Sequence, residues 1–211
     1  MIDYVNLLNR WTYLRIKKMP NLKREKGKAN FRFQDARLCF AFAGTLGDRG
    51  TETPFERLND AHDLERWCWE SGCAEGPVHC TTEQLESAKK LREAIQRAGV
   101  ALAWRKRVRP EDISLINLAA EASPLSPELQ FDGKTVRWSG TSLAAILSTV
   151  ARDFIEISGS DLRRRVRICS NPDCGIPFVD TSRAGSRRWC SMKTCGALIK
   201  KRQYRARKRS A

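Results

Sequence analysis

Apolar side chains recur at intervals of three and four residues in two long segments, which is the spacing of an amphipathic helix. The first follows Thr81-Thr82-Glu83-Gln84, a capping-box sequence, so we predict that a helix begins there. Its stripe consists of Leu85, Ala88, Leu91, Ile95, Ala98 and Leu102. The second covers 142–157 and is followed by Gly159. We predict shorter helices over 60–72, with an acidic first turn and a glycine stop, and over 111–122, after Pro110.

Two other segments have different patterns. Residues 129–138 alternate between apolar and polar around Asp132-Gly133, which predicts a β-hairpin. Residues 37–46 are apolar but too few for periodicity to separate a buried strand from a buried helix, and they belong to the core in either case. The pattern therefore predicts an α+β fold: a mainly helical N-terminal domain with a β-hairpin, followed by a small C-terminal module.

The formal charge of +15 is concentrated at the two ends of the 211-residue chain. Residues 1–30 carry eight basic and two acidic side chains, and 163–211 carry fifteen and two. We therefore divide the chain into a basic N-terminal arm (1–30), an α+β domain (31–160) and a C-terminal module (163–211). The composition of this arm suits a poorly ordered extension without a function at least as well as it suits a functional segment. Since membrane-length apolar runs and a signal-peptide pattern are missing, we expect a soluble, cytoplasmic protein.

Four cysteines occur as two pairs of equal spacing, Cys169-x4-Cys174 and Cys190-x4-Cys195. In a reducing compartment such pairs indicate metal ligation more than disulfides. Two short loops that each present two thiolates match the tetrahedral preference of Zn²⁺, and four protein ligands leave no open position for catalysis. We predict a structural zinc ion in a small treble-clef-like finger. Iron and four reduced, metal-free cysteines are the alternatives.

A cationic segment directly follows the cysteines. It suits a helix in which Leu198, Ile199 and Ala206 face the finger, while the cations bind phosphate groups of nucleic acid. The predicted contacts are Arg187, Arg188, Lys200, Lys201, Arg202, Arg205, Arg207, Lys208 and Arg209, with double-stranded DNA as the partner. Two alternatives stay open: a solvated tail, and an RNA-binding or ribosome-associated module.

The cysteine module resembles the CGNR zinc-finger family. The likeness rests on Arg167-Ile168-Cys169, Phe178 to Arg183, and Arg187 to Cys190 with Cys195-Gly196. In that family the finger follows an ABATE domain, and looser similarities upstream occur in the family's order, including Asp63-Leu64-x2-Trp67. The resemblance implies a bacterial transcription regulator with a structural zinc finger that binds DNA, ligated by Cys169, Cys174, Cys190 and Cys195.

Two departures from the family's pattern affect the expected function. The signature Asn-Arg is replaced by Ala197-Leu198, so we expect weaker sequence readout while phosphate binding is kept. The pattern Asp-Phe-Val-Asn-Thr is replaced by Ala41-Phe42-Ala43-Gly44-Thr45, which removes polar groups from any ligand pocket there. One alternative is therefore without support: a small-molecule effector that binds near Phe40, Thr45, Trp67 and Trp104. In that case the finger would serve only to direct the protein to its site of action.

Other candidate sites are weaker. Cys68, Cys73, His79 and Cys80 are too irregularly spaced to predict a second metal site, and Trp67-Cys68-Trp69 suits packing at a helix end. Cys39 is expected in the core and His62 on the surface. Since the chain offers no convincing phosphate loop, nucleophile motif or carboxylate pair, we predict that it is not an enzyme.

Overall fold

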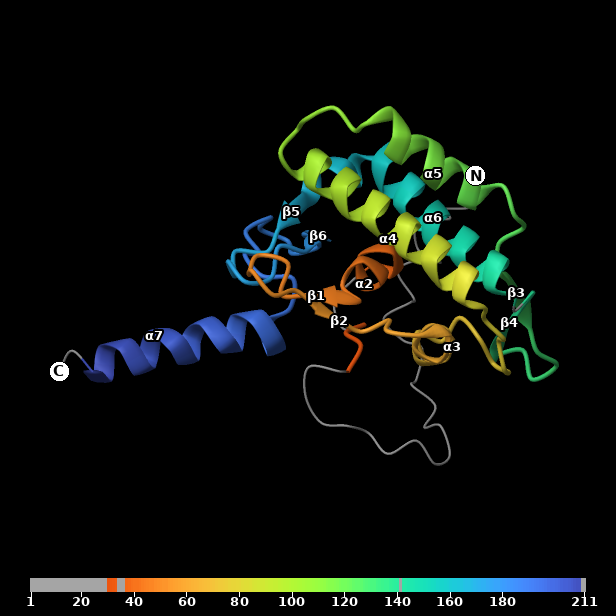
Figure 1. The fold of residues 1–211 in the computed structure, drawn as a ribbon, viewed down its shortest axis with the longest axis horizontal. Helices are drawn as coiled ribbons and strands as arrows, with labels where there is room; N and C mark the ends of the chain where they lie inside the picture. Colours follow the sequence, from red (N-terminus) through yellow and green to blue (C-terminus); the bar gives the residue numbers. More distant parts are fainter. Residues whose placement is uncertain (1–29, 34–36, 141, 210–211) are drawn as a thin grey trace.

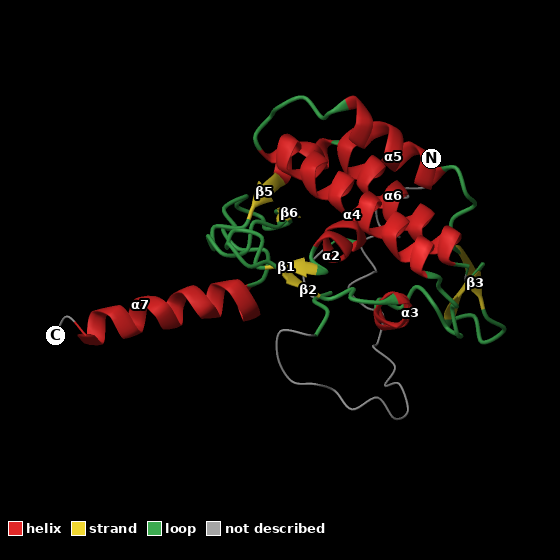
Figure 2. Ribbon diagram, in the orientation of Figure 1, coloured by secondary structure: helices red, strands yellow, loops and turns green. Residues whose placement is uncertain are grey.

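The computed structural model describes residues 30–33, 37–140 and 142–209. The predicted N-terminal arm lies outside these residues except for Asn30. The N-terminal region is mainly helical, with small hairpins, and a small module follows it (Figure 2). The predicted fold class is confirmed. Among the described residues, every helix is too short or too polar to cross a lipid bilayer.

The predicted helices are present with ordinary capping. Helix α3 (Ala61–Glu70) begins after Asp60, whose carboxylate accepts a hydrogen bond from the Asp63 amide. Helix α4 (Thr82–Ala103) has both bonds of the predicted capping box, between Thr81 and Gln84. Helix α5 (Pro110–Ala120) starts with its proline, and α6 (Leu143–Gly159) follows a capping Ser142. Local capping chemistry thus marked these boundaries to within a few residues.

The ambiguous apolar segment forms a short helix, α2 (Leu38–Ala43), with every residue buried. Helices α4, α5 and α6 pack side by side, and α2 lies against α4 and α6 (Figure 1). The Phe40 and Phe154 rings meet edge to face at 6.2 Å, and Phe42 lies 4.8 Å from Trp67. Because neighbours surround α2 on all sides, its sequence is apolar throughout and carries no helical stripe.

The strands form three small antiparallel pairs. Strands β1 (Leu46–Gly47) and β2 (Phe55–Glu56) follow α2. Strands β3 (Ser126–Leu129) and β4 (Val136–Ser139) form the predicted hairpin. Its connection is longer than the Asp-Gly pair alone, because the Asp132 carboxylate accepts bonds from the Lys134 and Thr135 amides inside the loop.

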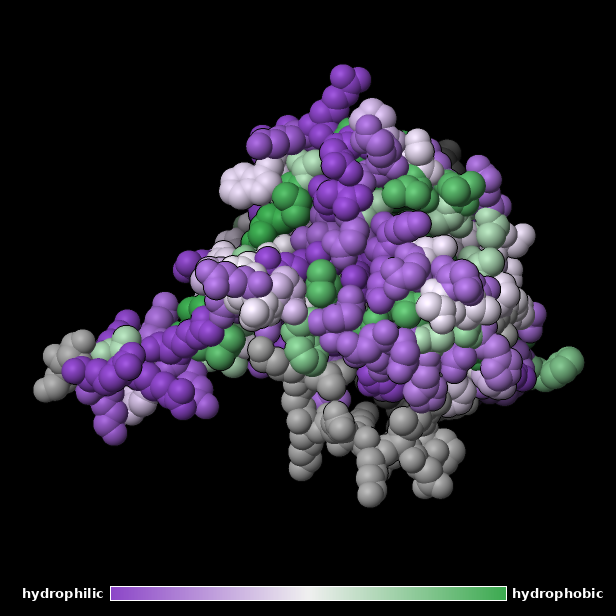
Figure 3. Space-filling view, viewed as in Figure 1, coloured by the Kyte–Doolittle hydropathy of each residue, from purple (hydrophilic) through white to green (hydrophobic). Residues whose placement is uncertain are grey.

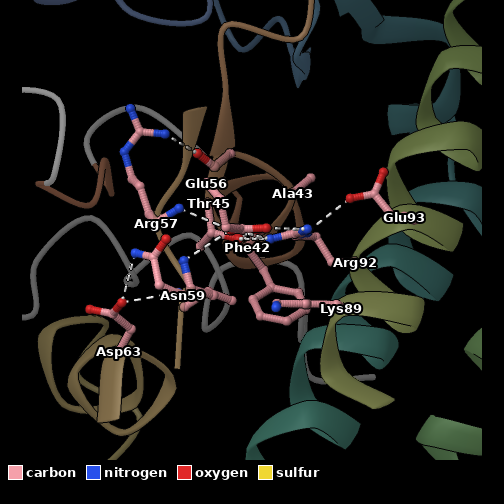
Figure 4. A network of polar contacts seen from close by, with 12 residues as sticks. Phe42, Ala43, Thr45, Glu56, Arg57, Asn59, Asp63, Lys89, Arg92 and Glu93 are labelled. Atoms are coloured by element: carbon pink, nitrogen blue, oxygen red, sulfur yellow. Dashed lines mark hydrogen bonds and ion pairs between the residues drawn. The ribbon is translucent and has the colours of Figure 1, made fainter. Parts of the chain in front are cut away.

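A polar network joins α4 to the β1–β2 hairpin (Figure 4). Arg92, 3% exposed, donates to both carboxylate oxygens of Glu56 at 2.7 and 2.8 Å and to the Thr45 hydroxyl at 3.3 Å. Arg92 also bonds Glu93, which accepts two bonds from Arg49. Burial raises the pKa of Glu56, but the hydrogen bonds from Arg92 outweigh it, so this pKa is lowered.

The proposed effector residues do not line one cavity. Phe40, Thr45 and Trp67 are each at most 1% exposed, whereas Trp104 is 66% exposed beyond the end of α4. The Thr45 hydroxyl donates to the Phe42 carbonyl and receives Arg92. The Thr45 hydroxyl is therefore occupied by internal partners, although the buried Trp67 indole N–H has none among the described residues, and the four residues do not surround one polar pocket, which counts against the small-molecule alternative.

The C-terminal module docks closely on the helical body. Strands β5 (Val166–Ile168) and β6 (Pro177–Val179) contact α4, and Val166 and Val179 belong to the main core. The Gln96 amide donates to the Gly175 carbonyl at 2.8 Å, and the Gly50 amide to the Asp173 carbonyl at 3.2 Å. The module is thus held to the body by apolar packing and by hydrogen bonds to its backbone.

Candidate metal centre and basic helix

A β-hairpin positions the first cysteine pair. Strand β5 leads into Cys169 and β6 follows Cys174, with the Cys169 amide donating to the Ile176 carbonyl at 3.0 Å. The Cys174 amide donates to the Asn171 carbonyl at 2.9 Å, and Gly175 has φ of +64°. Glycine adopts this left-handed conformation without strain, so the chain turns back directly after the second thiol. This is the predicted knuckle.

A loop and a helix start position the second pair. Cys190 ends the loop that follows β6, and Cys195 lies in a π-helical turn, η3 (Met192–Gly196), directly before α7 (Ala197–Arg209). The buried Asp180 carboxylate organises that loop by accepting bonds from the Ser182 amide and hydroxyl and from the Arg187 amide. Burial raises the pKa of Asp180, but these bonds lower it overall, so the carboxylate stays charged.

The four sulfur atoms converge on one point. They all lie within 4.8 Å of one another, and Cys190 Sγ is 3.7 Å from both Cys174 Sγ and Cys195 Sγ. Four thiolates at the usual zinc–sulfur distance of about 2.3 Å would stand about 3.8 Å apart at the corners of a tetrahedron. The residues present therefore fit the metal in donor type, number and spacing.

Polar groups next to the cluster favour thiolates. The Cys190 amide lies 3.5 Å from Cys169 Sγ, and the Asn171 side-chain amide lies 3.6 Å from Cys195 Sγ. Hydrogen bonding within the cluster, first from Cys174, lowers the pKa of Cys169 to about 7. The pKa of Cys195 is also lowered, while those of Cys174 and Cys190 are raised by the neighbouring thiols. The four thiols therefore do not all ionise by themselves, and a bound cation would stabilise all four as thiolates.

The two arginines before Cys190 differ in their surroundings. Arg187 is half-buried: its Nε donates to the Trp189 carbonyl at 2.9 Å, Nη2 donates to the Cys190 carbonyl, and the guanidinium lies 5.1 Å from the Phe178 ring. Arg188 is exposed, with its guanidinium 5.3 Å from the Trp189 ring. Arg187 therefore braces the loop, while Arg188 presents its charge to solvent.

Helix α7 projects from the finger and contains no buried residue (Figure 1). The expected apolar packing is wrong for Leu198 and Ala206, which are exposed; Ile199 is half-buried. In Figure 3 hydrophilic residues dominate the visible face of this helix. Arg202 of this helix forms an ion pair with Asp173 at 2.6 Å. Hydration of the cations keeps the helix in solvent, because packing it down would desolvate them.

Comparison with protein families fits this geometry. The ABATE family model, described as "Putative stress-induced transcription regulator", matches residues 36–161, more than half of the chain. The chain belongs to the ABATE family. A second model, the CGNR zinc finger, matches residues 165–208 of this ABATE protein and spans all four cysteines. No curated individual protein matches the chain. The family description is that of a transcription regulator and not of an enzyme.

In this ABATE protein the four-cysteine cluster is consistent with a structural Zn²⁺. It is the one group of metal-capable side chains found among the described residues. Burial raises the pKa of the Cys68, Cys73 and Cys80 thiols, which keeps them protonated. Cys39 is fully buried and the side chain of His62 is exposed, as predicted.

Sequence reasoning missed three polar residues of the finger: Asn171, which reaches Cys195; Asp173, which pairs with Arg202; and Asp180. Asn171 and Asp173 read as ordinary turn residues between two cysteines. Asp180 is one of only two acids in a strongly basic segment, and that isolation was the available signal.

Proposed function

We propose that this protein is a DNA-binding transcription regulator whose finger holds a structural Zn²⁺ and presents α7 to double-stranded DNA. Cys169, Cys174, Cys190 and Cys195 are the proposed ligands. The bound ion would supply folding free energy, because the finger's own apolar cluster is small. The chain's residues do the rest: Asp180 and Arg187 fix the loop between the pairs, and Cys195 fixes the start of α7.

The charge distribution around α7 carries the proposal. At about 100° per residue, the seven cations from Lys200 to Arg209 cover roughly 220° of the circumference, and Ile199, Gln203 and Ala206 occupy the rest. Thirteen residues give a length of about 20 Å. Like charges at Lys201, Arg205 and Arg209 repel one another at four-residue spacing, and phosphate binding removes that cost. A helix with cations on both flanks suits a groove with phosphates on both sides.

This shape favours duplex DNA over duplex RNA. The major groove of B-form DNA is about 12 Å wide and admits an α-helix, whereas the A-form major groove is deep and narrow. The proposed phosphate contacts are Arg188, Lys200, Lys201, Arg202, Arg205, Arg207, Lys208 and Arg209, with Arg187 supporting the adjoining edge. With Ala197 and Leu198 in place of the signature Asn-Arg, we expect affinity that depends more on salt than on sequence.

We assign separate roles to the basic C-terminal segment and to the helical N-terminal segment. Residues 163–211 form the DNA reader, and residues 31–160 form a sensor or assembly domain that sets its position. The hydrogen bonds from Gly50 and Gln96 to the finger support such coupling. Because bacterial DNA lies in the cytoplasm, the proposed function also requires a cytoplasmic protein.

The test is fluorescence anisotropy with a labelled 20-base-pair duplex over a range of salt concentrations. The double variant Lys201→Gln/Arg205→Gln should lower the salt slope by about 2, roughly one per lost phosphate contact. The matched control, Lys90→Gln/Lys134→Gln, removes two exposed cations outside the finger and should leave the slope unchanged. Equal slopes for both variants would refute the role of α7. Preferential competition by a structured RNA at 150 mM salt would favour the RNA-binding alternative instead.

A further inference from the structure

A second strongly basic feature lies at the junction between the helical body and the finger. A cavity of about 650 Å³ opens between the C-terminal end of α4, the 3₁₀ helix η2 (Asp161–Arg165) and strand β5. Leu102, Ala103 and Val166 give it an apolar floor. Strand β5 and helix α7 lie at opposite ends of the finger in Figure 1, so this cavity is separate from the proposed DNA-reading helix.

The polar lining of the cavity is entirely cationic. Arg105, Lys106, Arg163, Arg164 and Arg167 line it without a carboxylate among them. None of the ion pairs within the described parts of the chain involves any of the five. Arg167 is steadied by donating to the Arg164 and Val166 carbonyls at 2.8 and 3.0 Å. Five cations around one hollow repel one another, and a bound anion would remove that repulsion.

The C-terminal end of α4 is closed by backbone hydrogen bonds of its own. Helix C-termini normally present unsatisfied carbonyls, which repel negative charge. Here the amides of Trp104, Arg105 and Lys106 donate to the carbonyls of Val100, Leu102 and Ala101 at 3.1, 3.0 and 2.8 Å. These bonds satisfy three of the terminal carbonyls, and the attraction for an anion comes from the five cationic side chains.

Arg105 supplies an independent observation. Its φ of +54° lies in the left-handed region, at a helix end where glycine is the usual residue. A side chain is strained in this conformation, and such strain clusters at ligand sites. The chain therefore keeps a guanidinium at the cavity where glycine would fold more easily.

We propose that this cavity binds a ligand with several closely spaced phosphate groups. Its volume falls within the roughly 300–1,000 Å³ of small-molecule sites, and guanidinium groups suit phosphate oxygens. The phosphates could come from two sources: a free polyphosphate, such as the chain of a nucleotide, or the backbone of nucleic acid reaching past α7. Since one wall belongs to the body and the other to the finger, the ligand would bridge the two.

The experiment titrates zinc-loaded protein with inorganic tripolyphosphate by isothermal calorimetry at about 50 mM salt, where phosphate contacts are strong. The variant Arg105→Gly/Lys106→Ala should bind roughly tenfold more weakly, the loss expected when two solvent-exposed ion pairs are removed. Because glycine relieves the backbone at position 105, this variant should fold at least as well as the wild type. The Lys90→Ala/Lys134→Ala control should bind normally.

A second arm distinguishes the phosphate sources. If tripolyphosphate does not bind but the cavity variant loses roughly tenfold in duplex affinity by anisotropy, the site serves the nucleic-acid backbone. The α7 variant Lys201→Gln/Arg205→Gln should weaken duplex binding and leave tripolyphosphate binding intact, so failure of the proposed function is separable from failure here. Should Arg105→Gly disturb folding, Arg163→Glu/Arg164→Glu replaces two exposed cations and must show the same losses. Unchanged binding of both ligands by the cavity variants overturns the proposal.

Discussion

Replacing Gly50 with alanine is predicted to detach the first cysteine knuckle from the helical body. A Cβ atom at this position would lie 1.8 Å from the Pro172 carbonyl oxygen and 2.9 Å from its carbon. Both are backbone atoms between Cys169 and Cys174, so no side-chain rotation can relieve the clash. The hydrogen bond from the Gly50 amide to the Asp173 carbonyl, 3.2 Å long, would break as the two loops separate.

The expected cost combines two terms. Overpacking costs about 1–3 kcal/mol, and a lost backbone hydrogen bond about 0.5–1.5 kcal/mol. We therefore expect the free energy of unfolding of zinc-loaded Gly50→Ala, measured by urea titration, to fall by about 2–4 kcal/mol. Gly159→Ala is the matched control: its Cβ meets nothing within 4 Å, and it lies at the end of α6, where alanine is favoured. Gly50→Ala within about 0.5 kcal/mol of wild type would show that the knuckle does not dock on this loop.

The remaining predictions concern two carboxylates. Glu56→Gln should lower the free energy of unfolding at pH 7 by about 1.5–3 kcal/mol by weakening the Arg92 pair. Because the pKa of Glu56 is lowered from 4.5 in the folded state, its contribution is present above that value and is lost as the pH falls further. Urea titrations should therefore show the two proteins converging below about pH 4, and a constant gap would contradict the reasoning. Asp173→Asn should change stability by less than about 1 kcal/mol, since its partner Arg202 is half exposed, yet raise duplex affinity roughly threefold by releasing that cation. Anisotropy measures the affinity, with Glu128→Gln, an exposed acid on β3, as the charge-matched control; equal gains in both variants would argue against a local effect.

Helix boundaries could be predicted from the sequence wherever neighbouring residues determine them. The capping box at Thr81 and the proline at 110 marked helix starts correctly. The segment 37–46 remained ambiguous, because a fully buried helix such as α2 has no polar face to reveal its period. The Asp132 loop was underestimated, since its side-chain bonds to Lys134 and Thr135 extend the turn beyond the Asp-Gly pair.

The candidate site, too, could be predicted only where local chemistry determines it. Cysteine spacing predicted that four thiols meet, because two closely spaced pairs are the pattern of a four-ligand metal site. Spacing could not reveal that Arg187 turns inward to the Trp189 carbonyl, or that α7 leaves the finger without burying Leu198. Both depend on tertiary contacts of groups that look alike in the sequence. The docking of Gly50 on Pro172 is equally invisible, because Gly50 reads only as an ordinary turn residue between Asp48 and Thr51.

The most direct test of the central claim is the salt dependence of duplex binding before and after zinc is removed with a chelator. With zinc bound, we expect about five of the eight proposed cations to neutralise a phosphate at one time, which gives a slope of log K against log salt near −4.5. After removal the finger loses its fold, so the cations from Arg188 to Arg209 lose their common orientation, and we expect affinity to fall at least roughly tenfold with a shallower slope. Identical affinity and slope with and without the metal would show that an unstructured cationic tail accounts for the binding, and would contradict the account.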